Sequence, residues 1–307
     1  MSRGTTYSNP AAPQSEAVLI ASWGGADPAP MVSVCCIAYN HERYVAECLD
    51  GIFAQKTTFP FEVLVHDDAS SDSTQQVIRE YEQRFPSLLK PIYNTHNQFS
   101  QGRNVNPEFN FTRARGRYLA ICEGDDVWVD SAKLQSQVDF LEANPDYSLC
   151  FSDAIPVDMH GNLLESLRGT RRDLTAQELQ LTASIFTLTA CFRNVFQEWP
   201  REFANVRYGD LAIWSLLGDH GAGKFIADIE PSLYRQHDGG VHSSASRRSQ
   251  REMAIETISG LFSYRLRQGQ HALALRHLED ILVHAAALMG TRGFISLLRR
   301  AVRRLRH

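Results

Sequence analysis

The chain has 307 residues, 43% of them hydrophobic and 21% charged, and a chain of this length and composition can bury one large core. These values exclude a disordered tail, and a formal net charge of −4 gives no field that would attract nucleic acid, so no nucleic-acid partner is expected. The six cysteines lie mostly in apolar runs without metal-ligand spacing, which predicts reduced core thiols in a cytoplasmic protein.

Residues 1–30 are expected to form a flexible leader. They hold four of the 12 prolines, and their longest apolar run, Ala17–Ile20, is too short for a secretory signal. No apolar run elsewhere approaches the roughly 20 residues that a membrane-spanning helix needs.

Strands and helices are expected to alternate from residue 31 onward. The run Val32–Ala38 is β-branched and nearly continuous, as in a parallel strand buried on both faces, and Asn40 is expected to cap a helix that runs to Ala54. The same reasoning predicts strands at Phe61–Val65, Lys90–Tyr93 and Arg117–Cys122, and helices from Asp72 to Phe85 and from Pro107 to Ala114. This order predicts an α/β fold with a Rossmann-like, mostly parallel sheet flanked by helices.

Three polar clusters fall just past the ends of predicted strands, at Tyr39–Asn40, Asp67–Asp68 and Asp125–Asp126. Because ligands of such sheets bind at the carboxyl ends of the strands, we expect the three clusters to converge on one site. Adjacent carboxylates repel each other and are tolerated where a cation or a hydrogen-bond donor compensates them. An all-oxygen ligand set suits Mg²⁺ or Mn²⁺ rather than zinc.

Three ordered segments carry a family resemblance, namely Val32–Asn40, Glu62–Asp72 and Gly116–Trp128. They resemble the family 2 glycosyltransferases with a GT-A fold, over residues 31–240. The resemblance implies that a UDP- or dTDP-sugar binds at the strand ends and that its sugar passes to an acceptor hydroxyl with inversion at the anomeric carbon. It also implies Mn²⁺ or Mg²⁺ as cofactor, which would stabilise the leaving diphosphate.

The resemblance also implies roles for single residues. Asp126 would be the direct metal ligand and His237 a further metal contact, while the part played by Glu123 stays open. Asp210, at the start of a predicted helix, would be the base that takes the acceptor proton, and its alternative role is that of a helix N-cap. The residues expected to bind the nucleotide sugar are Ala38, Tyr39, Glu42, Asp68, Arg103 and Asp125.

Three of these donor contacts have a more specific expectation. Tyr39 would pack against the base or, alternatively, only cover the end of the sheet. Asp68 would accept the N3 proton of a pyrimidine. Arg103 would approach the diphosphate or else be solvated.

The implied domain spans residues 31–250, with a nucleotide-sugar-binding half at 31–130 and an acceptor-side half at 131–250. Helical periodicity follows, so residues 251–307 are expected to form a helical extension. Its end, 291–307, has six arginines, no acidic residue and apolar residues on one face, whereas the rest of the chain has 25 basic against 35 acidic residues, a net charge of −10.

This basic amphipathic helix has alternative roles that stay open. It could rest on the anionic inner face of the cell membrane and bring the site to a lipid-linked acceptor, or it could pack on its own domain or on a second copy in a homo-oligomer. The predicted location is therefore cytoplasmic, with peripheral membrane contact through 291–307.

The function predicted overall is sugar transfer to a glycan, lipid-linked or protein acceptor in surface polysaccharide, lipopolysaccharide or glycoprotein glycan assembly. The Gln-x-x-Arg-Trp element of processive synthases is missing, which favours single additions. One alternative is a sugar-phosphate nucleotidyltransferase, although Tyr39–Arg43 offers no glycine-rich loop. The other alternative is a nucleotide-sugar-binding scaffold that lacks a catalytic base.

Overall fold

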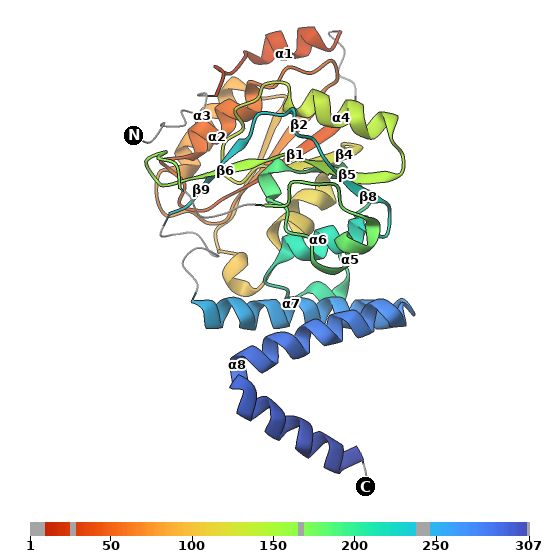
Figure 1. Cartoon of the computed structure of the whole chain (residues 1–307). Helices are drawn as coiled ribbons and strands as arrows, with labels where there is room; N and C mark the ends of the chain where they lie inside the picture. Colours follow the sequence, from red (N-terminus) through yellow and green to blue (C-terminus); the bar gives the residue numbers. More distant parts are fainter. Residues whose placement is uncertain (1–9, 25–28, 165–168, 238–245, 306–307) are drawn as a thin grey trace, which may run out of the picture.

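A computed structural model describes residues 10–24, 29–164, 169–237 and 246–305, and a seven-stranded sheet runs through its centre (Figure 1). The strand order is β3-β2-β1-β4-β7-β5-β8, and only β7 runs antiparallel to its neighbours. This confirms the predicted mostly parallel sheet. The strands are β1 (Val32–Ala38), β2 (Phe61–Asp67), β3 (Leu89–Tyr93), β4 (Tyr118–Ile121), β5 (Tyr147–Phe151), β7 (Cys191–Arg193) and β8 (Ala222–Phe225).

A second, smaller sheet pairs β6 (Ala154–Val157) with β9 (Ser232–Arg235) in parallel. Val127, in the segment that follows β4 of the main sheet, forms backbone hydrogen bonds with Leu233 of β9. The pairing therefore brings residues near 235 to the end of β4.

Both faces of the main sheet are buried, because alternate residues of each central strand enter different cores. Val34 and Cys36 of β1 pack with α2 (Val45–Phe53), α3 (Thr74–Arg84) and α4 (Lys133–Ala143). Cys35 faces the opposite core, which is covered by α5 (Ala176–Thr182) and α6 (Gly209–Leu217). All six cysteines are buried and free, as predicted.

The described part of the leader is not flexible, which corrects the prediction for residues 10–24. Ser15 caps α1 (Glu16–Ser22), and Leu19 is 1% exposed in the main core. The Glu16 carboxylate accepts the amides of Ser87 and Leu88 at 2.7 and 3.1 Å. Residues 1–9 and 25–28 lie outside the described residues.

Two predicted helices differ in the structure. Asn40 does not cap a helix, because it adopts φ +54° and its side chain accepts the amide of Ser71, while α2 begins only at Val45. The segment expected to be a helix from Pro107 to Ala114 is a π-helical turn, Asn106–Asn110, followed by a 3₁₀ turn. At the first of these segments, directly after β1, side-chain hydrogen bonds to the backbone outweigh helical propensity.

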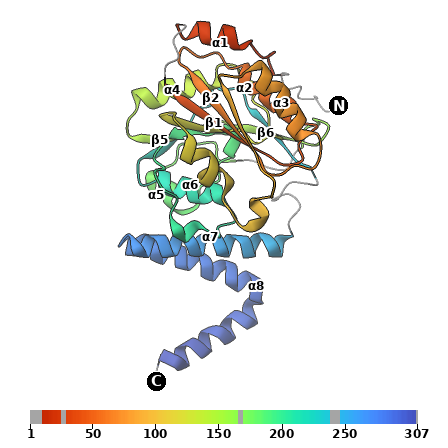
Figure 2. The same ribbon diagram turned by 180° about the vertical axis from the view of Figure 1, so that it is seen from behind.

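Two long helices follow the sheet domain. α7 (Arg247–Arg267) starts close to the expected boundary and packs beside α6, and α8 (His271–Leu305) lies on the side of α7 that faces away from the sheet (Figure 1, Figure 2). Gly290 interrupts α8 with φ +69°, a value that glycine adopts without strain, and the chain beyond it turns away from the domain in both views. Among the described residues, no helix is long and apolar enough to cross a membrane.

Candidate active site

The predicted polar clusters meet at one edge of the sheet. In the register of the strands Ala38 pairs with Asp67, and Cys35 pairs with Ile121, so β1, β2 and β4 end close together. The segments that follow these strands therefore lie side by side. β2 is two residues longer than predicted, so Asp67 closes the strand instead of following it.

Two histidines and one carboxylate form a cluster at this edge. The Nε2 atom of His237 lies 3.0 Å from Oδ2 of Asp125, and the Nε2 atom of His41 lies 3.8 Å from the same oxygen. One ligand atom from each of the three residues lies within 4.8 Å of the others, which fits a single metal ion. Within the described ranges, these three are the sole group of acidic, histidine or cysteine residues so arranged.

Electrostatics at the cluster lower the pKa values of Asp125 and of His41. Burial alone would raise the pKa of Asp125, but the hydrogen bond from His237 and the charges of both histidines hold it below its ordinary value. Burial lowers the pKa of His41.

Asp126, the expected direct metal ligand, lies outside this cluster. Its side chain is buried, and Oδ1 accepts the backbone amide of Arg235 at 2.9 Å. Burial and the charges of Asp125 and Glu123 raise its pKa well above the ordinary value. Asp125 lies in a turn that the amide of Asp126 closes on the carbonyl oxygen of Glu123, and of the two carboxylates Asp125 is the one that contacts His237.

Arg235 fixes the strand β9 next to the cluster. Its guanidinium donates to Oε2 of Glu47 at 2.7 Å and to the carbonyl oxygen of Asp125 at 3.0 Å, and it lies over the ring of Tyr44. His237, two residues further along the chain, is held against Asp125 by this arrangement.

A cavity of about 290 Å³ opens beside the cluster. Tyr39 lies on it with 46% of its surface exposed. The amide of Glu42 donates to Asp72, and the carboxylate of Glu42 accepts the amide of Ser73 at 2.9 Å, so Glu42 ties the loop after β1 to α3. The cavity is lined by Tyr39, Asn40, Glu42, Arg43, Tyr44, Asp72 and His237.

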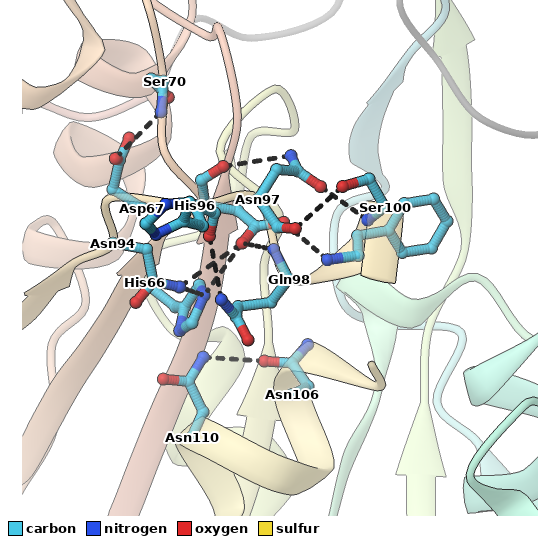
Figure 3. Close-up of polar contacts among 12 residues, drawn as sticks. His66, Asp67, Ser70, Asn94, His96, Asn97, Gln98, Ser100, Asn106 and Asn110 are labelled. Carbon is cyan, nitrogen blue, oxygen red and sulfur yellow. Dashed lines mark hydrogen bonds and ion pairs between the residues drawn. The ribbon is translucent and has the colours of Figure 1, made fainter. Parts of the chain in front are cut away.

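The Asp68 carboxylate makes its hydrogen bonds within the protein. Its carboxylate accepts the backbone amides of Gln98 and Phe99 at 2.7 and 3.0 Å, and it is 1% exposed. His66 and Asn94 lie next to Gln98 in this network (Figure 3). Although burial opposes it, these hydrogen bonds lower the pKa of Asp68. In the structure the Asp68 carboxylate thus holds the loop at Gln98 and Phe99, in place of the expected contact with the nucleobase of the donor.

Asp210 lies in the first turn of α6. Its charge contributes to the raised pKa values of Glu123 and of Tyr234. Burial and the charge of Asp125 are the larger causes for Glu123, whose pKa rises to about 7, and its carboxylate accepts the hydroxyl of Thr187 at 3.0 Å. Asp125 and Asp210 therefore both act electrostatically on Glu123.

The two other predicted donor contacts occupy different places. Ala38 is buried at the end of β1, and its carbonyl oxygen accepts the amide of Asp68 at 2.9 Å. Arg103 pairs with Glu108 and lies over the ring of Phe109 at 5.1 Å. Arg103 thus contacts Glu108 and Phe109 in this structure, and its contact with a diphosphate stays a prediction.

Sequence reasoning missed His41, Tyr44 and Glu47. Their one signal is position, because they follow the first strand directly, and the segment was instead expected to begin a helix at Asn40. A larger cavity of about 530 Å³, lined by residues such as Glu62, Lys90 and Arg113, opens at the amino-terminal half of β2 and β3, away from this cluster. The chemistry of the cluster, and not the size of a cavity, identifies the site.

Comparison with known proteins concerns the family and the fold of the chain. The model of glycosyl transferase family 2 matches residues 33–199. An uncharacterized protein of Mycobacterium tuberculosis is 37% identical over 220 residues, which is 70% of this chain, and the match spans 61% of that relative's length.

Two solved structures share the fold. TarS 1–349 of S. aureus, in complex with UDP-GlcNAc, has a TM-score of 0.56 and 17% identity, over 84% of this chain and 80% of its own. The mannosyltransferase PcManGT of Pyrobaculum calidifontis, in complex with GDP-Man and Mn²⁺, has a TM-score of 0.54 and 16% identity, over 99% of this chain and 85% of its own.

Proposed function

The chain belongs to glycosyl transferase family 2, and from this membership we propose that it is a metal-dependent, inverting enzyme that moves one sugar from a UDP- or dTDP-sugar to an acceptor hydroxyl. A nucleotide-sugar donor is supported by the complexes of TarS with UDP-GlcNAc and of PcManGT with GDP-Man. The arrangement that carries the proposal is the cluster of His41, Asp125 and His237 beside the cavity at the strand ends.

The residues of the cluster fit a divalent cation. Both imidazoles present Nε2 toward the same oxygen, Oδ2 of Asp125, at 3.8 Å from His41 and 3.0 Å from His237. A Cβ atom at Gly124 would lie 3.0 Å from Nδ1 of His41, so glycine at this position lets the imidazole keep its place. Two imidazoles with one carboxylate suit Mn²⁺ better than Mg²⁺, because Mg²⁺ prefers oxygen ligands.

We assign the base to Asp210. As the acceptor oxygen forms its bond to the anomeric carbon, the bond from that carbon to the diphosphate oxygen breaks, and the acceptor proton passes to the Asp210 carboxylate. A bound cation supplies positive charge that stabilises the leaving diphosphate. Tyr39, which is exposed at the cavity, packs against the base of the donor in this proposal.

A thermal-shift screen tests the donor and the metal together. The full chain is treated with EDTA and heated with UDP-, dTDP- or GDP-sugars, with and without Mn²⁺. A donor at about 100 times its Kd stabilises the folded state by about 2.7 kcal/mol, which raises the unfolding temperature measurably. We expect one nucleotide class to stabilise the protein only with Mn²⁺. If none of the nucleotide sugars stabilised the protein, the proposed donor class would be contradicted. If they stabilised it equally without Mn²⁺, the proposed metal dependence would be contradicted.

We further propose that residues 291–307 bind the anionic inner face of the cell membrane and bring the site to a lipid-linked glycan acceptor. The support is the segregation of charge, six arginines without an acidic residue at the end of an otherwise acidic chain, and the kink at Gly290 that directs the end of α8 away from the domain.

Vesicle sedimentation tests the membrane contact. Full-length protein is expected to bind vesicles that contain phosphatidylglycerol and not pure phosphatidylcholine, whereas protein that ends at Gly290 binds neither. Equal failure of both proteins to bind phosphatidylglycerol vesicles would remove the membrane role.

A further inference from the structure

The segment that carries Asp210 is held at its start by a side chain from outside the sheet domain. The Oγ1 atom of Thr257, in the middle of α7, accepts the amide of Arg207 at 3.1 Å and the amide of Tyr208 at 3.0 Å. Thr257 is 0% exposed and donates its own proton to the carbonyl oxygen of Met253. α6 has no side-chain cap of its own, so Thr257 fixes the chain two residues before Asp210.

A second side chain of α7 holds the other end of α6. Arg265 is 0% exposed, and its Nη2 atom donates to the carbonyl oxygen and to the hydroxyl of Ser215, both at 2.8 Å. Its Nη1 atom contacts both carboxylate oxygens of Asp219 at 2.7 Å. Charge-assisted contacts of this kind are roughly twice as strong as neutral ones.

Between these two anchors α7 and the segment before α6 approach very closely. A Cβ atom at Gly260 would lie 2.8 Å from the carbonyl oxygen of Glu202, so this approach requires glycine. Leu261 packs against Phe203 and Ala212 in a small core of its own. The nine residues of α6 span about 13 Å, and a helix of this length that is fixed at both ends has little freedom to tilt.

We propose that Thr257 and Arg265 are positioning residues for Asp210, which makes α7 a part of the catalytic unit instead of an appended extension. The inference rests on the proposed function, because it takes Asp210 to be the base. Proton removal depends on the placement of the base relative to the acceptor oxygen, and a displacement of about 1 Å can lower the rate on the order of 100-fold. Donor binding, at Asp125 and the cavity, does not involve these contacts.

The first test uses the variants Thr257→Val and Thr257→Ser. Valine keeps the shape but removes the oxygen that accepts the two amides, whereas serine keeps that oxygen. Ser263→Ala is the matched control, because this exposed hydroxyl on α7 bonds only within its own helix. The probe is the nucleotide sugar that binds in the thermal-shift screen, and the rate is the release of nucleoside diphosphate with water as acceptor in the presence of Mn²⁺.

We expect Thr257→Val to lower kcat on the order of tenfold or more with donor KM changed less than twofold, and Thr257→Ser and Ser263→Ala to stay near wild type. Hydrogen exchange of peptides that cover residues 205–212 should rise in Thr257→Val but not in peptides of β1. An unchanged kcat together with unchanged exchange, or an equal loss of donor affinity and rate, would overturn the proposal.

Two further variants separate the possible failures. Arg265→Lys keeps the charge opposite Asp219 but cannot reach both acceptors of Ser215, and it should lower kcat in the same way even where Thr257→Val does not fold. Asp210→Asn should abolish turnover while donor binding remains. Full turnover in Asp210→Asn would refute the proposed base, whereas loss there with wild-type kcat in Arg265→Lys and Thr257→Val would refute only the positioning role.

Discussion

The change Asp68→Asn decides between two roles for this residue. The family resemblance implies that Asp68 accepts a proton from the base of the donor, whereas in the structure its carboxylate holds the loop at Gln98 and Phe99. Asparagine retains one acceptor oxygen and turns an NH₂ group toward one of the two amides. That part-buried amide loses its bond to a charged acceptor, which is worth about 1.5–3 kcal/mol.

We therefore expect the free energy of unfolding, measured with urea at pH 7, to fall by about 2 kcal/mol in Asp68→Asn. The control is Asp139→Asn, an exposed carboxylate on α4 with one side-chain contact to Gln135, for which the change should stay within about 0.5 kcal/mol. Donor affinity should change little, because the variant removes a contact with the loop and not a contact with the nucleobase of the donor.

The pH dependence gives a second measurement of the same effect. The folded-state pKa of Asp68 lies below its ordinary value, so its stabilising contribution is present above the unfolded pKa, near about 3.9, and is lost as the pH falls through the folded pKa. The difference in stability between wild type and Asp68→Asn should shrink in that acidic range. A variant with wild-type stability that has lost donor affinity would refute the loop-holding role.

Three other changes have defined outcomes. His41→Ala should weaken Mn²⁺ binding at least tenfold, measured by titration calorimetry, whereas Asp126→Asn should leave it within about threefold; the reverse order would refute the cluster as the metal site. Asp210→Asn should abolish nucleoside-diphosphate release while the Mn²⁺-dependent thermal shift by the donor persists, and retained release would refute the base. Burial lowers the pKa of Lys133 to about 8, so unfolding should take up a proton between about pH 8 and 10.5. As the pH rises through that range, the free energy of unfolding of wild type should therefore increase by up to about 3 kcal/mol relative to Lys133→Met. A difference between the two proteins that stays constant with pH would show that Lys133 is not desolvated.

The sequence by itself determined the sheet and the edge that carries the site. A run such as Val32–Ala38 is apolar on both sides of the chain, and only a parallel strand covered on both faces buries it fully, so local pattern was enough. The polar residues that end such strands then had to meet at one edge, and they do. Membership of glycosyl transferase family 2 followed from motifs at that edge.

Which side chains meet there was decided only by the tertiary structure. His41 and His237 are 196 positions apart. His41 reaches Asp125 from the segment after β1, and His237 reaches it because β9 pairs with β6 and is held by Arg235, contacts that no local pattern encodes. Asp125 and Asp126 have nearly the same local context, and the direction of each side chain depends on the packing of the loop.

The same limit applies at the two ends of the chain. Proline content predicted a flexible leader, but Leu19 enters the core because a hydrophobic contact site exists for it only after the sheet and its helices have formed. Helical periodicity identified the extension after residue 250, yet it could not show that Thr257 accepts two amides next to Asp210. Periodicity shows which face of an element is apolar, whereas the whole fold determines what packs against that face.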